Sequence, residues 1–403
     1  MTDRSIEVQA WLDDRGGEMA ALLEALVRVP TENPPGRELG RCASMLRDAL
    51  DRLGVSAELI ELAPTGSLER PAIVRGTVGS GSELVYYHGH FDVVPAQSSS
   101  QFEPERREGK IIGRGTADMK GGLVSMLYGA AAAGELGLLD DRKVVFHFVC
   151  DEETGSTAGA GGLRDGELID PDAVAMLTAE PTGGVIWHAC RGAITLRVQT
   201  TGREAHVGYV HEGVNAFEHM IRIAAPLTAL SHELLNKRTS FPVERDEAAG
   251  SMLVVGGQAG AGAGFNVVPG SAWFSIDRRF NPEEQLDREL SRLTGMIEAA
   301  ADAVGANVDI EVLQAQPSGR TDQDHPAAQT LARCVEAVDG AGATFQLCPG
   351  VLDTRWYSQL GIPAFAYGGG RLDVSHGPNE YIDETAMRRC AAVYALFAAQ
   401  ITR

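Results

Sequence analysis

Apolar residues fall alternately into short continuous runs and longer helical spacings over the first part of the chain. The runs at 83–88 and 143–150 are typical of buried strands, and a helix rich in small residues is predicted between them at 119–134. Further strands are predicted at 173–179 and 362–369. This alternation of strands and helices favours a mixed, mostly parallel sheet with flanking helices.

The chain between the last two of these strands has a different rhythm. Its patterns follow the order β-α-β-β-α-β, which is found in ferredoxin-like modules. The predicted elements lie at 193–201, 213–235, 251–257, 271–280, 283–304 and 307–315. We therefore predict an α/β fold with a catalytic domain at 1–190 and 315–403 and an inserted α+β domain at 191–314.

Two glycine-rich stretches invite comparison with phosphate-binding loops. Residues 256–264 are followed by neither G-K-[ST] nor a helix, so we predict a hairpin connection there. Gly368, Gly369 and Gly370 close a predicted strand without the G-x-G-x-x-G spacing of a dinucleotide site. Neither stretch predicts a nucleotide site.

Composition narrows the expected partners and compartment. The formal net charge of −20 over 403 residues opposes attraction to nucleic acid and to anionic membranes. The first residues lack a basic start and an apolar signal core, and no segment approaches membrane-spanning length. The six cysteines are scattered without a C-x-x-C pair, which is typical of core residues in a reducing compartment. We therefore expect a cytoplasmic protein without nucleic-acid or membrane partners.

Acidic and imidazole side chains follow several predicted strands. Ligands of open α/β sheets bind beyond the carboxyl ends of the strands. The residues at those ends are His90, Asp92, Asp151, Glu152, Glu153, Glu180 and His376. Asp118 joins them at the start of the glycine-rich helix, where a helix N-terminus favours a carboxylate.

Carboxylates gathered on one rim repel one another unless a cation compensates them. Imidazole and carboxylate ligands without thiolate suit zinc, and cobalt or manganese fits the same ligands. Five candidate ligands exceed what one catalytic zinc uses while a water position stays open, namely His90, Asp118, Glu153, Glu180 and His376. The sequence therefore predicts two metal ions per subunit.

These motifs resemble the zinc aminoacylase and exopeptidase family, which contains acetylornithine deacetylase, succinyl-diaminopimelate desuccinylase, aminoacylase and glutamate carboxypeptidase. The segments that carry the resemblance are HGHFDVVP, GRGTADMKGG, DEETGS, AEPT, REAHVGYVHEGVNA and SHGPNE. Together they span nearly the whole chain. The resemblance implies a zinc-exopeptidase-like catalytic domain and gives the inserted domain a role in dimerisation.

The resemblance also implies how the metal ligands divide. Asp118 would bridge both ions. His90 and Glu180 would complete one site, and Glu153 and His376 would complete the other.

Two further acids receive other roles from the resemblance. Asp92 would be a partner of His90, which fits the need to fix the tautomer of a ligand imidazole. Glu152 would be the general base. Zinc lowers the pKa of a bound water toward about 7, so a carboxylate beside ligand Glu153 is placed to take its proton and pass it to the leaving amine. The expected products are a carboxylate and a free amine.

The inserted domain contributes candidate residues for substrate binding. His206 matches a family histidine that enters the active site of the neighbouring subunit and stabilises the oxyanion, so the resemblance implies a homodimer. Asn266 and Arg279 match substrate-contacting positions, and a guanidinium suits a substrate carboxylate. Arg278 alternates to the opposite strand face, where we expect it to be solvated.

The chain departs from the family pattern at several positions. The family stretch H-S-S-x-P reads HVGYV, G-T-D reads VLD at 351–353, and Gly369 replaces a frequent proline. Leu352 lacks the hydroxyl that some relatives use, and Arg355 binds either substrate or an internal acid. The histidines without motif support are expected to be structural or exposed: His88, His147, His188, His211, His219, His232 and His325.

The expected substrate is a small N-acyl-amino acid with a free carboxylate. A dipeptidase or carboxypeptidase would use the same chemistry on a peptide bond and remains the alternative. A catalytically inactive relative that binds a metabolite is a remoter alternative, and retention of Glu152 with all five ligands argues against it.

Overall fold

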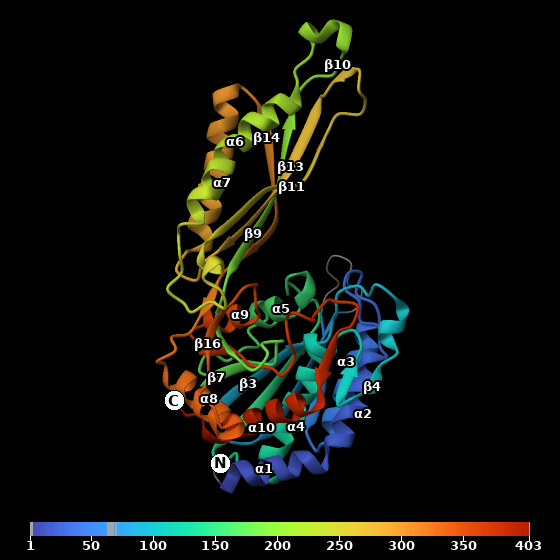
Figure 1. Ribbon diagram of the computed structural model, residues 1–403, viewed down its shortest axis with the longest axis vertical. Coiled ribbons are helices and arrows are strands. Elements are labelled where there is room, and N and C mark those ends of the chain that lie inside the picture. Colours follow the sequence, from blue (N-terminus) through green and yellow to red (C-terminus); the bar gives the residue numbers. More distant parts are fainter. Residues whose placement is uncertain (1–2, 63–67, 69–70, 403) are drawn as a thin grey trace. The chain divides into compact units, whose positions relative to one another are not determined.

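The computed structural model describes residues 3–62, 68 and 71–402 (Figure 1). The chain divides into two compact units. The first unit comprises Met1–His188, Arg320–Gln346 and Asp353–Arg403, and the second comprises Ala189–Gly319 and Leu347–Leu352.

A nine-stranded sheet lies mostly in the first unit, in the order β1-β2-β6-β3-β7-β17-β8-β15, with β16 paired to β8. Its strands are β1 (Ser56–Glu61), β2 (Ala72–Gly79), β3 (Glu83–His90), β6 (Arg142–Val149), β7 (Ala175–Thr178), β8 (Ile186–Cys190), β15 (Gly319–Arg320), β16 (Phe345–Cys348) and β17 (Ala364–Ala366). The last residues of β8 and β16 and the first residue of β15 are assigned to the second unit. The neighbours β6, β3, β7 and β17 are parallel, whereas β1, β2 and β8 pair antiparallel with their neighbours. The predicted mixed sheet is therefore confirmed.

Helices pack on both faces of this sheet. The helices of the first unit are α1 (Asp3–Asp14), α2 (Gly16–Val27), α3 (Leu39–Arg52), α4 (Gly121–Glu135), α5 (Ala160–Asp165), α8 (Pro326–Asp339), α9 (Thr354–Ser358) and α10 (Glu384–Gln400). Val85 and Tyr87 of β3 belong to the larger core, which includes α4 and α10, whereas Leu84 and Tyr86 belong to a smaller core with α5 and α9. Successive strand side chains point to opposite faces, so the sheet separates these two cores.

Strand β3 is buried along nearly its whole length, from Leu84 to His90. A strand covered on both faces has no need of alternating polar positions, which explains the continuous apolar run. The strand continues two residues beyond its predicted end, because Gly89 and His90 still pair with β6. His90 is therefore held by the rigid end of a central strand.

Helix α4 owes its position to its small residues. A Cβ on Gly129 would lie 2.5 Å from the carbonyl oxygen of Ala391 in α10, and one on Gly122 would lie 2.3 Å from that of Ala179. Larger side chains would push the helix away from both neighbours. This close packing brings the start of α4 to the carboxyl ends of the strands.

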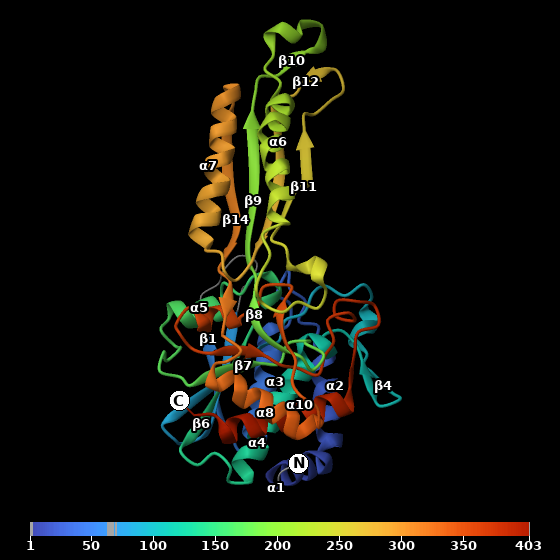
Figure 2. The same ribbon diagram turned by 60° about the vertical axis from the view of Figure 1, so that its left-hand side comes forward.

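The second unit contains one antiparallel sheet in the order β11-β13-β9-β14 and two long helices that lie side by side (Figure 2). Its main elements are β9 (Gly192–Thr201), α6 (Ala216–Leu234), β11 (Met252–Ala261), β13 (Ser271–Phe280), α7 (Leu286–Val304) and β14 (Asn307–Gln316). Both helices share one core with the alternating buried positions of β13. The predicted β-α-β-β-α-β order is confirmed.

The prediction of a hairpin connection at 256–264 was partly wrong. Strand β11 continues to Ala261, and Ala259 pairs with Phe274 of β13. A register shift between Val255 and Ala259 accommodates Gly256, whose φ is +78°. Pairing with β13 therefore outweighs the weak strand preference of the glycines, and a bulge absorbs the mismatch.

Two smaller sheets lie outside the two main ones. A three-stranded sheet contains β4 (Glu105–Arg107), β5 (Lys110–Ile112) and β18 (Tyr381–Asp383), and a short ribbon contains β10 (Ala205–His206) and β12 (Val267–Val268). All six cysteines are buried free thiols, as predicted. Within the described part of the chain, no helix combines the length and apolar character needed to cross a membrane.

Candidate metal centre

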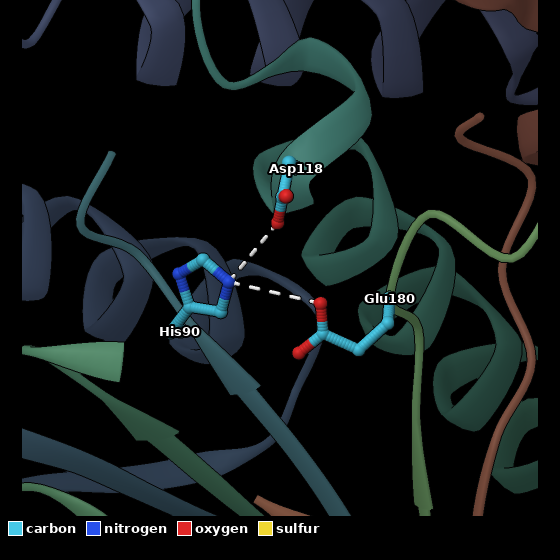
Figure 3. A group of neighbouring side chains, drawn as sticks. All are labelled: His90, Asp118 and Glu180. Carbon is cyan, nitrogen blue, oxygen red and sulfur yellow. Dashed lines mark hydrogen bonds and ion pairs between the residues drawn. The ribbon is translucent and has the colours of Figure 1, made fainter. Parts of the chain in front are cut away.

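His90 ends the central strand β3 and faces two carboxylates (Figure 3). Its Nε2 atom lies 3.2 Å from Oδ1 of Asp118 and 3.9 Å from Oε2 of Glu180. Glu180 follows β7, the parallel neighbour of β3, and all three side chains are largely buried. The structure thus brings together the three residues that the resemblance assigned to one ion.

Asp118 lies in a π turn, Thr116–Lys120, that leads into α4. Its backbone is extended there, with φ −127° and ψ 96°. The backbone N–H groups of Ala117 and Asp118 donate to Oε1 of Glu380 over 3.0 and 3.1 Å, and Glu380 forms a buried ion pair with Arg114. A second carboxylate therefore holds the backbone that carries Asp118.

A second group of donors shares Asp118. Oδ2 of Asp118 lies 3.3 Å from Nε2 of His376, and the same Nε2 lies 3.3 Å from Oε1 of Glu153. Glu153 follows β6, and His376 lies in the loop after β17 with φ +63°. The structure thus also brings together the residues assigned to the other ion.

The donor atoms of both groups suit a divalent cation. Within each group, one ligand atom from every residue lies within 4.8 Å of the others. Oε1 of Glu153 is buried, and its contact with Nε2 of His376 joins two groups that would both be ligands of one cation. Mixed imidazole and carboxylate donors are characteristic of catalytic metal sites.

The pKa shifts of these residues also indicate a cation site. Burial raises the pKa of Glu180 to about 8. Hydrogen bonds to Asp118 and Glu153 raise the pKa of His376 to about 10. Burial opposes ionisation of His90, yet its pKa is raised well above the ordinary value because Asp118 and Asp92 bind its protonated ring. Protons are held tightly because negative charge is in excess, and a metal cation would relieve that excess.

Asp92 connects the His90 ring to the loop that follows β6. Its Oδ1 lies 3.2 Å from Nδ1 of His90, and its carboxylate oxygens accept the backbone N–H groups of Glu152 and Glu153 over 3.2 Å each. Asn33 donates to the same carboxylate over 3.0 Å. Asp92 is therefore placed to orient His90 and also to hold the backbone of the next loop.

Glu152 precedes the candidate ligand Glu153, and its carboxylate is not held by a hydrogen bond or an ion pair from any described residue. Burial raises the pKa of its carboxyl group well above the ordinary value. Across residues 3–62, 68 and 71–402, its carboxylate takes part in no hydrogen bond or ion pair. A carboxylate without a fixed partner is free to accept and release a proton.

The glycines after β17 allow two chain segments to approach the centre. A Cβ on Gly368 would lie 2.1 Å from the carbonyl oxygen of Glu180, and one on Gly370 would lie 2.3 Å from that of Ala117. Side chains at these positions would displace the backbone of residues at the site. The glycine run therefore serves close packing.

The candidates in the second unit divide between the two ends of its sheet. His206 and Asn266 are exposed and adjacent, because β10 pairs with β12 and Val207 donates to the carbonyl oxygen of Asn266 over 2.9 Å. Arg279 lies near the other end of β13, where it pairs with Asp277 and is one-third exposed.

The expectation that Arg278 is solvated was wrong. Its guanidinium is fully buried and lies 2.6 Å from Glu284 and 2.7 Å from Glu289. Arg278 shares a strand face with Phe274 and Ile276, which are buried in the core of the second unit. Two carboxylates compensate its charge there.

Arg355 is also enclosed, at 1% exposure. It lies 3.2 Å from Oδ1 of Asp353 and donates to the carbonyl oxygen of Gly155 over 3.2 Å. Of the two roles expected for Arg355, this position favours binding of an internal acid. Leu352 is buried as well.

Several contributors to the site were missed from the sequence, namely Asn33, Arg114, Asp353 and Glu380. Arg114 and Glu380 lie inside GRGTADMKGG and SHGPNE, next to predicted ligands. Their charged side chains, so close in sequence to predicted ligands, could have indicated that they support the site. Asn33 precedes two prolines far from any predicted strand end, and nothing in its sequence context indicates a role.

The fold and the paired donor groups define a metal-dependent hydrolase. The model of Peptidase family M20/M25/M40 matches residues 86–400. The chain belongs to this family, and the predicted resemblance is confirmed.

Individual relatives are named for different activities. The succinyl-diaminopimelate desuccinylase of Methylorubrum extorquens is 29% identical over 397 residues, covering 93% of this chain and 96% of the relative. The N-formyl-4-amino-5-aminomethyl-2-methylpyrimidine deformylase of Halalkalibacterium halodurans is 23% identical over 402 residues, covering 94% and 92%. The M20 family metallo-carboxypeptidase Sso-CP2 of Sulfolobus solfataricus has a similar fold, with a TM-score of 0.78, 17% identity and coverage of 95% and 98%.

Proposed function

We propose that the chain is a deacylase that hydrolyses the amide bond of an N-acyl-amino acid. The observation that carries this proposal is the position of Asp118 between His90 and His376, with the uncommitted carboxylate of Glu152 beside them. The desuccinylase and the deformylase among the relatives both remove acyl groups, which favours this reaction over peptide cleavage.

Two divalent cations would be held by the two donor groups, one by His90, Asp118 and Glu180 and the other by Asp118, Glu153 and His376. The imidazole and carboxylate donors favour zinc, and cobalt or manganese suits them as well. When bound, such cations acidify water and polarise a substrate carbonyl.

Glu152 would move the proton in this reaction. A carboxylate oxygen of Glu152 takes a proton from the attacking water and delivers it to the nitrogen of the scissile amide, which leaves as a free amine. Asp92 keeps Glu152 in place by accepting its backbone N–H. No other described side chain competes for that carboxylate.

Arg279 would bind the substrate by donating hydrogen bonds to its free carboxylate, and Asn266, which lies beside His206 at the other end of the sheet, would contact the substrate of a neighbouring subunit. The guanidinium of Arg279 is one-third exposed, and its partner Asp277 on the same strand is equally accessible, so exchange for a substrate carboxylate costs little. Arg355 is given no substrate role, because its guanidinium is enclosed and paired.

A homodimer would bring His206 to the active site of a neighbouring subunit, where its imidazole would stabilise the oxyanion. Large apolar side chains lie exposed close to His206 in the sequence, with Tyr209 58% and Val210 62% exposed. Exposed apolar residues near one another favour a protein interface. The cytoplasmic location remains a prediction from the sequence.

The decisive experiment combines metal analysis of the purified protein with a panel of N-acetyl-amino acids, N-succinyl-amino acids and dipeptides. Deacylation is expected to dominate, with about two equivalents of zinc. Cleavage confined to dipeptides would replace the proposal with the exopeptidase alternative. No turnover of any substrate by metal-loaded protein would favour an inactive, metabolite-binding relative.

Two variants test the assigned roles. Glu152→Gln is expected to lower kcat by at least about 10²-fold with both metals retained, whereas exposed Glu103→Gln should leave kcat unchanged. Mixing the Glu152→Gln and His206→Ala proteins should restore part of the activity if His206 acts across a dimer. Absence of recovery after demonstrated subunit exchange would contradict that role.

A further inference from the structure

The loop that carries Glu152 and Glu153 has an unusual backbone. Asp151, Gly155 and Ser156 all have left-handed φ angles, of +70°, +105° and +59°. For residues other than glycine such conformations are unfavourable and persist only where the surroundings impose them. The loop therefore depends on contacts from outside it.

Contacts on one side of this loop come from the segments that follow β3 and α2. Asp92 accepts the backbone N–H groups of Glu152 and Glu153. Asn33 links the same carboxylate to the hydroxyl of Thr154, to which it donates over 2.9 Å. The beginning of the loop is thereby fixed.

Contacts on the other side come from the segment at the start of α9. The hydroxyl of Ser156 donates to Oδ1 of Asp353, and both residues are buried. Arg355 pairs with the same oxygen over 3.2 Å and donates to the carbonyl oxygen of Gly155. Asp353 thus holds the end of the loop directly and through its neighbour.

The other carboxylate oxygen of Asp353 is held by His88. Nε2 of His88 lies 2.8 Å from Oδ2 of Asp353, and Nδ1 of His88 lies 3.1 Å from the hydroxyl of Tyr357. That hydroxyl also lies 2.9 Å from Nδ1 of His147. Although burial opposes ionisation, the hydrogen bond with His88 and the charge of Arg355 lower the pKa of Asp353 to about 2. Asp353 is therefore an ionised, rigidly held acceptor.

We propose that Asp353 is a positioning residue that acts through Ser156 and Arg355 to hold Glu152 and Glu153 at the metal centre. Asp353 belongs to neither donor group. Its effect on catalysis rests on the proposed function, but its effect on the loop does not. The departure from the family pattern at 351–353 leaves this carboxylate in place.

Two variants remove the contact from opposite ends. Asp353→Asn keeps the shape of the side chain but removes its charge, and Ser156→Ala removes a single buried hydroxyl. Thr330→Ala is the matched control, because its buried hydroxyl donates over 2.9 Å to the carbonyl oxygen of Pro326 within α8. If Asp353→Asn fails to fold, Ser156→Ala still provides the test.

Hydrogen exchange measures the loop without any substrate. Amide exchange in 151–156 is expected to become about tenfold faster in both variants, while exchange in β6 stays as in the wild type and in Thr330→Ala. Unchanged exchange in 151–156 would overturn the proposal. Equal acceleration in β6 would also overturn it, because general destabilisation would then explain the effect.

Turnover then tests the consequence for catalysis. For the best substrate of the panel, kcat should fall about tenfold or more in both variants, with KM within about twofold and the metal content unchanged. The double variant should lose no more than Asp353→Asn alone, since both changes break one contact. Faster loop exchange with an unchanged kcat would overturn the positioning role. If the wild type turns over no substrate, the proposed function fails, and the exchange data alone decide whether Asp353 holds the loop.

Discussion

The carboxylate of Glu380 lies 2.6 Å from the guanidinium of Arg114, and neither side chain is more than 1% exposed. The other oxygen of Glu380 accepts the backbone N–H of Asp118 over 3.1 Å. A buried ion pair thus supports the carboxylate that both donor groups share.

Glu380→Ala is expected to destabilise the protein by about 3–5 kcal/mol, because Arg114 would remain as an uncompensated buried charge. The milder Glu380→Gln should weaken metal binding about 10–100-fold by loosening the backbone at Asp118. Denaturant unfolding and zinc titration of the apoprotein measure the two effects. Glu384→Gln is the control, since its partner Arg106 is half exposed, and an equal loss of zinc affinity there would refute the assignment.

The two donor groups should release their metals at different rates. The side chain of His376 is 47% exposed, whereas that of His90 is 1% exposed. A chelator should therefore remove the ion held with His376 first, and elemental analysis over time should resolve two phases. His376→Ala should abolish the fast phase, and simultaneous loss of both ions from the wild type would contradict this expectation.

Stability should fall in mildly acidic solution because of His147. Burial lowers the pKa of His147 well below its ordinary value, so the unfolded chain binds a proton that the folded chain refuses. The contribution is complete above about pH 6.5 and is lost as the pH falls, by about 1.4 kcal/mol per pH unit. The variant His147→Phe keeps an aromatic ring against Tyr86. The slope of its unfolding free energy against pH should be smaller by about 1.4 kcal/mol per pH unit, which corresponds to the uptake of one proton fewer on unfolding. Equal slopes in both proteins would argue against a neutral buried His147.

Replacing Arg278 should lower the stability of the protein, whereas replacing its neighbour Arg279 should weaken substrate binding. Arg278→Met leaves the buried Glu284 and Glu289 with only the half-exposed Lys237 as a cation, and it is expected to cost about 3–5 kcal/mol of unfolding free energy. Arg279→Met should change stability by no more than about 0.5 kcal/mol but raise KM for the acyl-amino acid. Paired denaturation curves and kinetics separate these effects, and a stable Arg278→Met protein would contradict the structural role.

The residues of the metal centre that lie at strand ends were predictable, because each of these strands is a continuous apolar run in the sequence. His90 ends β3, Glu153 and Glu180 follow β6 and β7 within a few residues, and the parallel order of those strands leaves them a common edge. Burial on both faces imposes this pattern, so a local reading of the sequence detects it.

The supporting contacts were not predictable in the same way. Asp353 meets Ser156 across 197 positions of the chain, and Asn33 meets Asp92 across 59. Pairings over such distances depend on the packed fold, and no local period encodes them. Arg278 was misjudged for a different reason. Alternation correctly placed it on the strand face opposite Arg279, but that face packs into the core of the second unit and is not exposed to solvent.

The buried cysteines provide a built-in probe of how the molecule opens. Four of them, Cys42, Cys150, Cys334 and Cys390, lie in the first unit, whereas Cys190 and Cys348 lie in the second. A thiol reagent can reach a buried sulfur only when the structure around it opens. The order in which these six sulfurs become alkylated under mild denaturation would therefore report which unit unfolds first, without any label being added to the chain.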